Sequence, residues 1–434
     1  MRLWIVNHYA YAPNHFAGTR HYSLARHLIR RGHDVTVIST SFFHKACRET
    51  RLTKGESYKR EVIDGVPFHW MRTPPYQGNT FGRLWNMAVF AGRVWREQGL
   101  AHEPRPDAII GSSPDLLAAW AAERLARRFG VPFVLEIRDL WPETLVSLGR
   151  VSRIHPLVLW MSRIERGLYH RADRILSLLP GAAEFIAQHG GAREKTVWLP
   201  NGIDLEWIPE PTPIEEKSTF TVMFAGAHGP ANGLDLVLDA AEILQKNPAP
   251  MPIRIQLVGD GREKPRLMQK AQTAGLKNVE FVAPVPKQQV YEKLQQADAF
   301  LMVLENSPVF QWGISPNKLW DYMACARPVI FSVSTPYNPV EEAGAGVTAI
   351  PGDPRSLAES IRTLAAQPLA VRREMGQHAR EHVLRHHSFE NLAVTLEGML
   401  HELIGEKRGD SGGNSVPALP SNSGTNEHNQ RRAA

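Results

Sequence analysis

Residues 313–330 read GISPNKLWDYMACARPVI, and this stretch predicts a turn, a helix and a buried strand in close succession. Ser315 is suited to cap the helix, and Pro316 is suited to its first position. Leu319 and Met323 then recur at helical spacing, which predicts an apolar face that packs on a core. Pro328 ends the helix, and the residues after it form a short apolar strand. A strand–helix alternation of this kind is typical of a parallel α/β sheet.

The start of this predicted helix is suited to bind an anion. The backbone N–H groups near Asn317 and Lys318 have no partner inside the helix, so they can hold a phosphate. Asp321 lies one turn further along the same face, where a carboxylate can accept hydrogen bonds from the diol of a ribose. An anion site beside a diol acceptor indicates a nucleotide diphosphate. An ordinary capped helix with a solvated Asp321 is the alternative that the local pattern leaves open.

The rest of the chain alternates apolar strands with helical patterns in two series. We predict a first domain over residues 1–199, a linker over 200–218 and a second domain over 219–385. The polar, proline-rich segment Pro209–Ser218 marks the linker by its composition. A helix over 386–404 is predicted to pack back on the first domain. The tail 405–434 has few apolar residues and is expected to be disordered.

Charge is unevenly distributed along the chain. Residues 1–200 hold 28 Lys and Arg against 17 Asp and Glu, whereas residues 201–434 hold 22 against 27. This asymmetry indicates that the first half meets an anionic surface. No nucleic-acid motif is present, so the inner face of a membrane is the preferred partner. Two cysteines and the lack of a long apolar run are typical of a cytoplasmic protein.

An amphipathic helix is predicted between Gly78 and Leu100. It carries Trp85 and Trp95 beside Arg83 and Arg93, a pattern that suits a membrane interface or the apolar tail of an acceptor. A core helix with arginines that reach out to solvent is the alternative. A second helix over 153–171 could lie beside it.

Charged residues follow the predicted strand Phe133–Ile137. Arg138 and Asp139 come directly after the strand, before a Trp-Pro turn and Glu143. The carboxyl ends of parallel strands are where α/β proteins place their chemistry. Arg138 and Asp139 are therefore candidate functional residues, although a simple ion pair between the two is the alternative. Gly18, in the loop after the first strand, is a further candidate at the same edge.

Six fragments in this order resemble glycosyltransferases of family 4, which have the two-domain GT-B fold with two Rossmann-like domains facing a cleft. The fragments are GTRHYSLARHLIRRGHDVTVI, LPNGID, FAGAHG, LVGDG, VEFVAPVPKQQVYEKLQQADAFL and NKLWDYMACARPVIFS. The resemblance covers about residues 1–404. The RDLWPE and SPNKLWDYMA segments are most similar to the branch that adds N-acetylated deoxy-sugars such as N-acetylfucosamine in bacterial O-antigen or capsule assembly.

The resemblance implies a donor site in the second domain. Asp321 matches the ribose-binding carboxylate of the E-x7-E motif, while Gly313 replaces the first Glu of that motif. The family's pyrophosphate-binding Arg and Lys fall near His228 and Asn232 here, so a cation must come from elsewhere. We hypothesise that Lys318 supplies it, with Arg262 as a second candidate. The expected donor-binding set is Gly18, His228, Gly229, Arg262, Ser315, Pro316, Asn317, Lys318 and Asp321, and the expected catalytic set is Asp139, Arg138 and Lys318.

The predicted activity is retaining transfer of a sugar, an N-acetylated hexosamine or deoxyhexosamine, from a UDP-sugar to a lipid-linked oligosaccharide. In this mechanism the leaving phosphate accepts the acceptor's proton, so Asp139 and Arg138 orient substrates. No cofactor, metal or nucleic acid is expected, and the enzyme is expected to be cytoplasmic and peripheral at the membrane. The alternatives are a UDP-N-acetylglucosamine 2-epimerase and a non-catalytic GT-B protein that binds nucleotide sugars or a partner.

Overall fold

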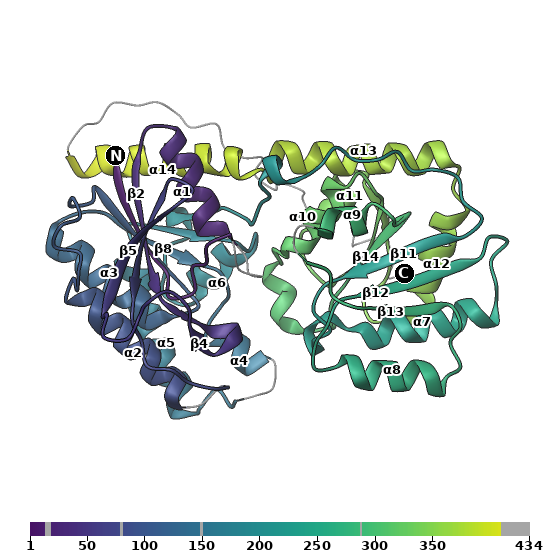
Figure 1. Ribbon diagram of the computed structural model, residues 1–434, viewed down its shortest axis with the longest axis horizontal. Coiled ribbons are helices and arrows are strands. Elements are labelled where there is room, and N and C mark those ends of the chain that lie inside the picture. Colours follow the sequence, from purple (N-terminus) through teal and green to yellow (C-terminus); the bar gives the residue numbers. More distant parts are fainter. Residues whose placement is uncertain (14–18, 79–80, 148–150, 287–288, 409–434) are drawn as a thin grey trace, which may run out of the picture.

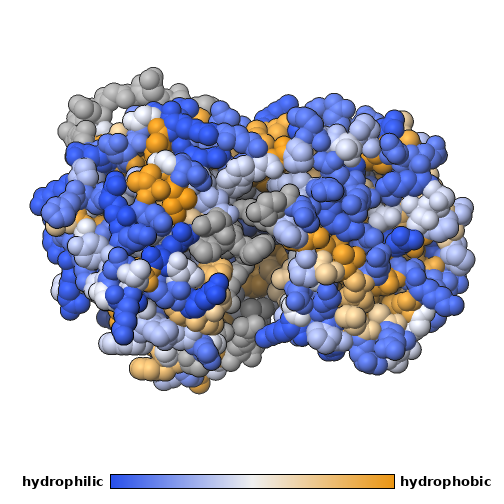
Figure 2. All heavy atoms as spheres, viewed as in Figure 1, coloured by the Kyte–Doolittle hydropathy of each residue, from blue (hydrophilic) through white to orange (hydrophobic). Residues whose placement is uncertain are grey.

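The computed structural model describes residues 1–13, 19–78, 81–147, 151–286 and 289–408. Two α/β domains lie side by side, each with a mainly parallel sheet covered by helices on both faces (Figure 1). The predicted fold class, two Rossmann-like domains in a GT-B arrangement, is confirmed. Figure 2 shows the surface hollowed between the two lobes. Parallel sheets place their binding sites at the carboxyl ends of their strands.

The first domain contains an eight-stranded sheet in the order β10-β9-β8-β7-β1-β2-β6-β5. Every neighbouring pair is parallel except β5 and β6, which form an antiparallel hairpin at the edge. Its elements are β1 (Arg2–Val6), α1 (Arg20–Arg30), β2 (Asp34–Thr40), β5 (Tyr58–Ile63), β6 (Val66–Met71), α2 (Phe81–Trp95), β7 (Ala108–Ser112), α3 (Leu116–Phe129), β8 (Phe133–Ile137), α4 (Glu143–Ser147), α5 (Pro156–Arg171), β9 (Arg174–Ser177), α6 (Ala182–Gln188) and β10 (Thr196–Trp198), with a separate pair of two-residue strands β3 (Phe42–Phe43) and β4 (Arg48–Glu49).

The second domain contains a parallel six-stranded sheet in the order β13-β12-β11-β14-β15-β16. Its elements are β11 (Phe220–Ala225), α7 (Leu234–Lys246), β12 (Ile253–Val258), α8 (Lys264–Thr273), β13 (Val279–Val282), α9 (Val290–Leu294), β14 (Ala299–Val303), α10 (Asn317–Ala324), β15 (Val329–Ser332), α11 (Pro339–Glu342), β16 (Gly346–Thr348), α12 (Pro354–Ala366) and α13 (Leu369–His386). The central strand β14 (AFLMV) is apolar and buried along its whole length because helices cover both faces of the sheet. α7 and α12 bury one face, and α10 and α13 bury the other.

The last helix, α14 (Phe389–Arg408), returns to the first domain. It lies beside α1, and seven apolar side chains between Leu392 and Ile404 join the core that covers one face of the first sheet. Figure 1 shows α13 over the second domain and α14 over the first, almost in line. Residues 405–408, which the sequence placed in a disordered tail, instead continue α14. The remaining tail, 409–434, lies outside the described residues, as does Gly18.

The segment between the domains is held in place. Ile214 is buried, and its carbonyl accepts hydrogen bonds from the guanidinium of Arg373 in α13. The carbonyl of Thr212 accepts a hydrogen bond from Arg327 Nη1 at 2.9 Å. The proline-rich stretch therefore packs along the second domain instead of hanging free. Within the described ranges, no helix has the length and apolar character needed to cross a bilayer.

Candidate functional site

The start of α10 differs from the prediction in its cap. Pro316 stands at the N-cap, and Ser315 makes no capping hydrogen bond. Instead, Ser315 Oγ accepts a hydrogen bond from the backbone N–H of Asn201 at 2.8 Å, and the Asn201 amide donates to the Ser315 carbonyl at 2.8 Å. Asn201 belongs to the Asn-Gly turn after the first sheet. Ser315 therefore joins the two domains instead of capping the helix, because its backbone lies beside that turn.

Lys318 points from the first turn of α10 toward the loop after β11. Its ammonium group lies 4.3 Å from the centre of the Phe224 ring and donates a hydrogen bond to Asn232 Oδ1. Burial lowers the pKa of Lys318 to about 7. A cation kept without a carboxylate partner in a desolvated position attracts anions strongly. The structure thus brings Lys318 and Asn232 together, as the hypothesis about the pyrophosphate site requires.

The loop after β11 is packed backbone to backbone against the loop after β12. A Cβ on Gly259 would lie 2.0 Å from the carbonyl oxygen of Gly226, and one on Gly261 would lie 2.4 Å from that of His228. The His228 N–H donates to the Asp260 carbonyl at 2.8 Å. Only glycine permits this close approach at residues 259 and 261. Gly229 has open space beside it, so a ligand could approach its backbone closely.

Two members of the predicted donor set take unexpected positions. The imidazole of His228 is fully buried, and neither ring nitrogen has a hydrogen-bond partner among the described residues. Burial lowers the pKa of His228, which keeps the ring neutral. The Arg262 side chain is 68% exposed and lies 3.7 Å from Glu263. The structure thus places the Arg262 side chain at the surface, beside Glu263.

Asp321 lies one turn beyond Asn317, as predicted for a ribose-binding carboxylate. Its Oδ1 accepts a hydrogen bond from the hydroxyl of Tyr291 at 2.7 Å. Tyr291 belongs to α9, near the end of β13, so the carboxylate is fixed in orientation by a neighbouring element. An ionised carboxylate accepts several hydrogen bonds, which leaves capacity for a diol beside the tyrosine. Tyr291 is a residue that the sequence analysis missed, although its place after β13 could have suggested it.

Arg138 and Asp139 lie at the carboxyl end of β8, on the first-domain side. The Arg138 backbone N–H donates to Ser113 Oγ at 2.9 Å, and its buried Nε has no partner among the described residues. The Asp139 side chain is exposed to solvent. Restricted hydration nevertheless raises the pKa of Asp139, an effect that Arg138 partly opposes. This pair therefore presents a cation and a carboxylate at the edge of the first sheet.

A buried network beneath Arg138 was not predicted. Glu136 accepts hydrogen bonds from Arg20 Nε at 2.8 Å and from His21 Nε2 at 2.6 Å. Burial alone would raise the pKa of Glu136, but His21 and Arg20 outweigh it and hold this pKa well below its ordinary value. Arg20 also donates to the carbonyls of Leu199 and Pro200. The network thus ties α1 to β8 and to the turn that enters the second domain.

A second buried pair, His8 and Asp115, was also missed. His8 Nδ1 lies 2.6 Å from Asp115 Oδ2, and the His8 ring stacks between Tyr9 and Phe90. Asp115 also caps α3, because its Oδ1 accepts hydrogen bonds from the N–H groups of Leu117 and Ala118. The capping position of Asp115, just before an alanine-rich helical stretch, was the signal in the sequence. The pair places an oriented imidazole at the end of β1.

The two domains meet at Gly313, where the family motif has a glutamate. The Gly181 N–H donates to the Trp312 carbonyl at 2.8 Å. Gly313 has φ of +108°, and a Cβ there would lie 2.3 Å from Cδ of Pro180. Trp312 packs edge to face on Phe185 of α6. A glycine at residue 313 therefore permits a direct contact between the domains that a longer side chain would block.

Two α/β domains that face each other across a cleft define the class of GT-B proteins. In this chain, Lys318 lies beside the glycine-containing loop after β11 in the second domain. Residues 17–202 match the model of a glycosyl transferase 4-like domain, and residues 219–367 match that of glycosyl transferases group 1. Together these two matches span most of the chain. The chain therefore belongs to the glycosyltransferases that combine these two domains.

Similar proteins and structures support this assignment. The chain is 25% identical to WcaI of Escherichia coli K12, named as a glycosyl transferase of colanic acid biosynthesis, over 68% of this chain and 74% of that protein. It is 22% identical to the glycosyltransferase WbjE of Pseudomonas aeruginosa, over 59% and 66%. Among solved structures, sucrose-phosphate synthase from Thermosynechococcus elongatus has a TM-score of 0.70 at 17% identity and covers 93% of this chain and 99% of its own. HepE from Anabaena, in complex with UDP and glucose, has a TM-score of 0.64 at 16% identity and covers 93% and 100%.

Proposed function

We propose that this glycosyltransferase transfers a sugar from a UDP-sugar to a lipid-linked oligosaccharide, with retention of the anomeric configuration, in bacterial surface polysaccharide synthesis. The observation that carries the proposal is the Lys318–Asn232 pair, which holds an unneutralised ammonium between the glycine loop and the start of α10. A diphosphate bound there meets a cation, open backbone at Gly229 and helix N–H groups. Asp321 then lies one turn away for the ribose.

The reaction needs no nucleophile from the protein. The bond between the sugar's anomeric carbon and the β-phosphate oxygen breaks while the acceptor oxygen bonds to the same face of that carbon. The acceptor's proton passes to the leaving phosphate oxygen. Lys318 stabilises the negative charge that develops on the diphosphate, which is usually the largest catalytic contribution. Arg138 and Asp139 orient the two substrates from the opposite sheet.

A pocket on the first domain suits an anionic acceptor lipid. It has a volume of about 910 Å³ and begins at Pro142 and Glu143, directly after the Arg138–Asp139 edge. Apolar and cationic side chains line it together, with Leu159 and Trp160 beside four arginines (Arg153, Arg163, Arg166 and Arg171). Burial raises the pKa of Glu165, the other acid in the lining, to about 8, so this group is neutral at pH 7. The pocket therefore carries net positive charge and fits a lipid diphosphate.

The exposed surface of α2 and of α5, the helix that also lines this pocket, suits a membrane interface. Of the thirteen large apolar side chains exposed in the described residues, seven lie on α2 and on α5 with the turn before it: Phe81, Trp85, Trp95, Ile154, Leu157, Leu159 and Trp160. Both helices contact α3, and Figure 1 shows them on the same side of the first domain. Clustered tryptophans with arginines nearby are typical of proteins that dock peripherally on anionic lipid. We propose that this surface holds the enzyme at the inner face of the cytoplasmic membrane.

Three measurements test the proposal. A UDP-sugar panel with a radioactive sugar should label extracted lipid, and NMR of the product should show the donor's anomeric configuration.

R163A/R166A should reduce transfer while the UDP-induced rise in melting temperature persists, because these exposed arginines lie on the acceptor side. W85S/W160S should weaken binding to anionic vesicles, whereas M268S, which removes a similarly exposed apolar side chain from α8, should not. Vesicle binding that is unaffected by W85S/W160S would refute the membrane surface, and lipid that never gains label would refute the transfer.

A further inference from the structure

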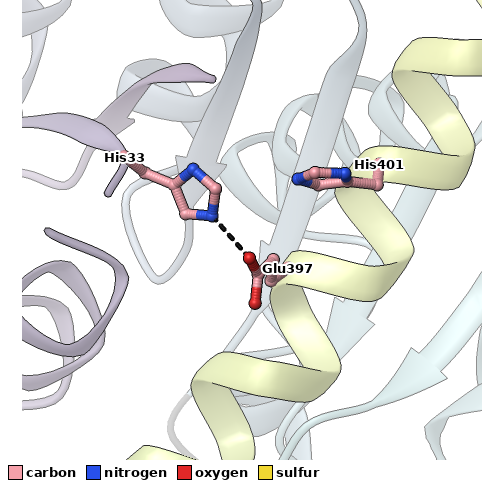
Figure 3. A group of neighbouring side chains, drawn as sticks. All are labelled: His33, Glu397 and His401. Carbon is pink, nitrogen blue, oxygen red and sulfur yellow. Dashed lines mark hydrogen bonds and ion pairs between the residues drawn. The ribbon is translucent and has the colours of Figure 1, made fainter. Parts of the chain in front are cut away.

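Three potential metal ligands converge on the outer side of the first domain, away from the interdomain cleft. They are His33, in the turn between α1 and β2, and Glu397 and His401, which are four residues apart on α14. Figure 3 shows the three side chains turned toward one another across the junction of these elements. One ligand atom from each lies within 4.8 Å of the other two. Residues four apart share a helix face, so α14 presents Glu397 and His401 together.

The chemistry and spacing of this set suit Zn²⁺. Two imidazoles and one carboxylate are a common donor set for zinc, with bonds of about 2.0–2.2 Å. Ligand atoms of a tetrahedral zinc site are therefore about 3.4 Å apart. His33 Nε2 already lies 2.7 Å from Glu397 Oε1. A rotation of the exposed His401 side chain would bring its nitrogen into range, and that exposure leaves a fourth position open to water.

The surroundings fix two of the three ligands in place. The His33 side chain is only 8% exposed and that of Glu397 17% exposed, so both are held by packing. The second carboxylate oxygen, Oε2, accepts a hydrogen bond from Arg31 Nε. This contact orients the carboxylate as neighbouring groups commonly orient metal ligands, while Oε1 faces the two imidazoles.

We propose that His33, Glu397 and His401 bind a zinc ion that fastens α14 to the first domain. α13 packs on the second domain and α14 on the first, so this pair of helices connects the two halves of the cleft. An ion at this junction would hold the returning helix against the α1–β2 turn. The proposal concerns a site remote from the sugar-transfer machinery and does not depend on the donor or acceptor.

The test uses the full-length protein without an affinity tag, freed of metal by chelation. One equivalent of Zn²⁺ should bind in competition with a chromophoric chelator and raise the melting temperature, and Co²⁺ should give the visible absorption of a site with nitrogen ligands. H401A, which removes an exposed ligand and leaves a good helix former, should weaken Zn²⁺ binding on the order of 100-fold and abolish the thermal shift. H102A removes another exposed histidine and should behave like the unmodified protein.

Two results would overturn the proposal. One is the absence of any Zn²⁺ binding at micromolar concentration by the unmodified protein. The other is binding that survives H401A, which would place the ion elsewhere, for example at the neighbouring His382 and His386 of α13. Far-UV circular dichroism of H401A should match that of the unmodified protein, so that lost binding reports the missing ligand and not an unfolded helix.

Discussion

Replacing Lys318 with methionine should stabilise the protein and abolish nucleotide binding together. The pKa of Lys318 is about 7 because burial strips water from its ammonium. Since one pKa unit corresponds to about 1.4 kcal/mol, keeping this cation in the folded protein costs up to about 5 kcal/mol below pH 7. The Asn232 hydrogen bond and the Phe224 contact, about 1 kcal/mol each, are lost in K318M. The free energy of unfolding of K318M should therefore be about 3 kcal/mol higher than that of the unmodified protein, which corresponds to a rise in melting temperature of roughly 5–10 °C.

The sign of this effect can be checked through pH. The pKa of Lys318 in the folded protein lies below that in the unfolded chain, so the unfolded chain binds more protons between about pH 7 and pH 10. The stability of the unmodified protein should therefore approach that of K318M as pH rises through this window. UDP binding, which needs the protonated lysine, should weaken by up to about tenfold per pH unit above pH 7 in the unmodified protein only.

The assay is a thermal-shift and urea-unfolding series with and without UDP at pH 6.5 and pH 9. K246M is the matched control, because the Lys246 side chain is 70% exposed and, among the described residues, pairs only with Glu242 one helical turn away. This control should change neither stability nor UDP binding beyond about 0.5 kcal/mol. A K318M protein that is less stable at pH 6.5, or one that keeps the full UDP-induced shift, would show that Lys318 is not the desolvated diphosphate ligand described above.

Three further variants probe other parts of the chain. G313E should lower the free energy of unfolding, measured by urea unfolding, by several kcal/mol instead of restoring the family motif. Its Cβ would lie 2.3 Å from Pro180, and φ at residue 313 is +108°. Stability equal to that of the unmodified protein would contradict this contact. R20A should cost about 3–5 kcal/mol by leaving Glu136 buried without its guanidinium, and the loss should shrink at acid pH as Glu136 takes up a proton. E165Q should leave stability at pH 5 almost unchanged but stabilise the protein increasingly from about pH 5 to pH 8, because burial raises the pKa of Glu165 to about 8 and in this window only the unfolded chain releases the proton; urea unfolding at pH 5 and pH 8 checks it.

The sequence predicted the alternation of strands and helices in the second domain because its strands are short runs rich in apolar residues. Three of these strands, at Ile253–Val258, Val279–Val282 and Ala299–Val303, follow one another with helices between them in the structure. The hairpin of β5 and β6 was missed, since Tyr58–Ile63 carries three consecutive charged residues, Lys59 to Glu61, and lies at a sheet edge. Its turn, Asp64-Gly65, has positive φ at both residues and is a standard hairpin signal that could have identified it.

Site residues on a single helix were predictable from the sequence, whereas contacts between residues on two separate elements were not. Asn317 and Asp321 share one helix, so their spacing alone predicted a common face. The contact of Lys318 with Asn232 joins residues 86 positions apart, and that of Glu136 with Arg20 joins residues 116 apart. No local pattern encodes such pairings. The position of Arg262 after Gly261 likewise suggested the donor site, but the sequence could not show that this side chain is exposed to solvent.

The glycine that replaces the motif glutamate and the buried position of Lys318 both affect the charge at the proposed donor site. A glutamate at residue 313 would place a carboxylate at the contact between the two domains, beside Pro180. Gly313 removes that charge and lets Trp312 and Pro180 bring the domains into contact. Under the proposed function, Lys318, which has no carboxylate partner among the described residues, would supply the attraction for the diphosphate. The free energy needed to bury this cation lowers the pKa of Lys318. The stability gained in K318M and the affinity of the unmodified protein for UDP should therefore both depend on this free energy.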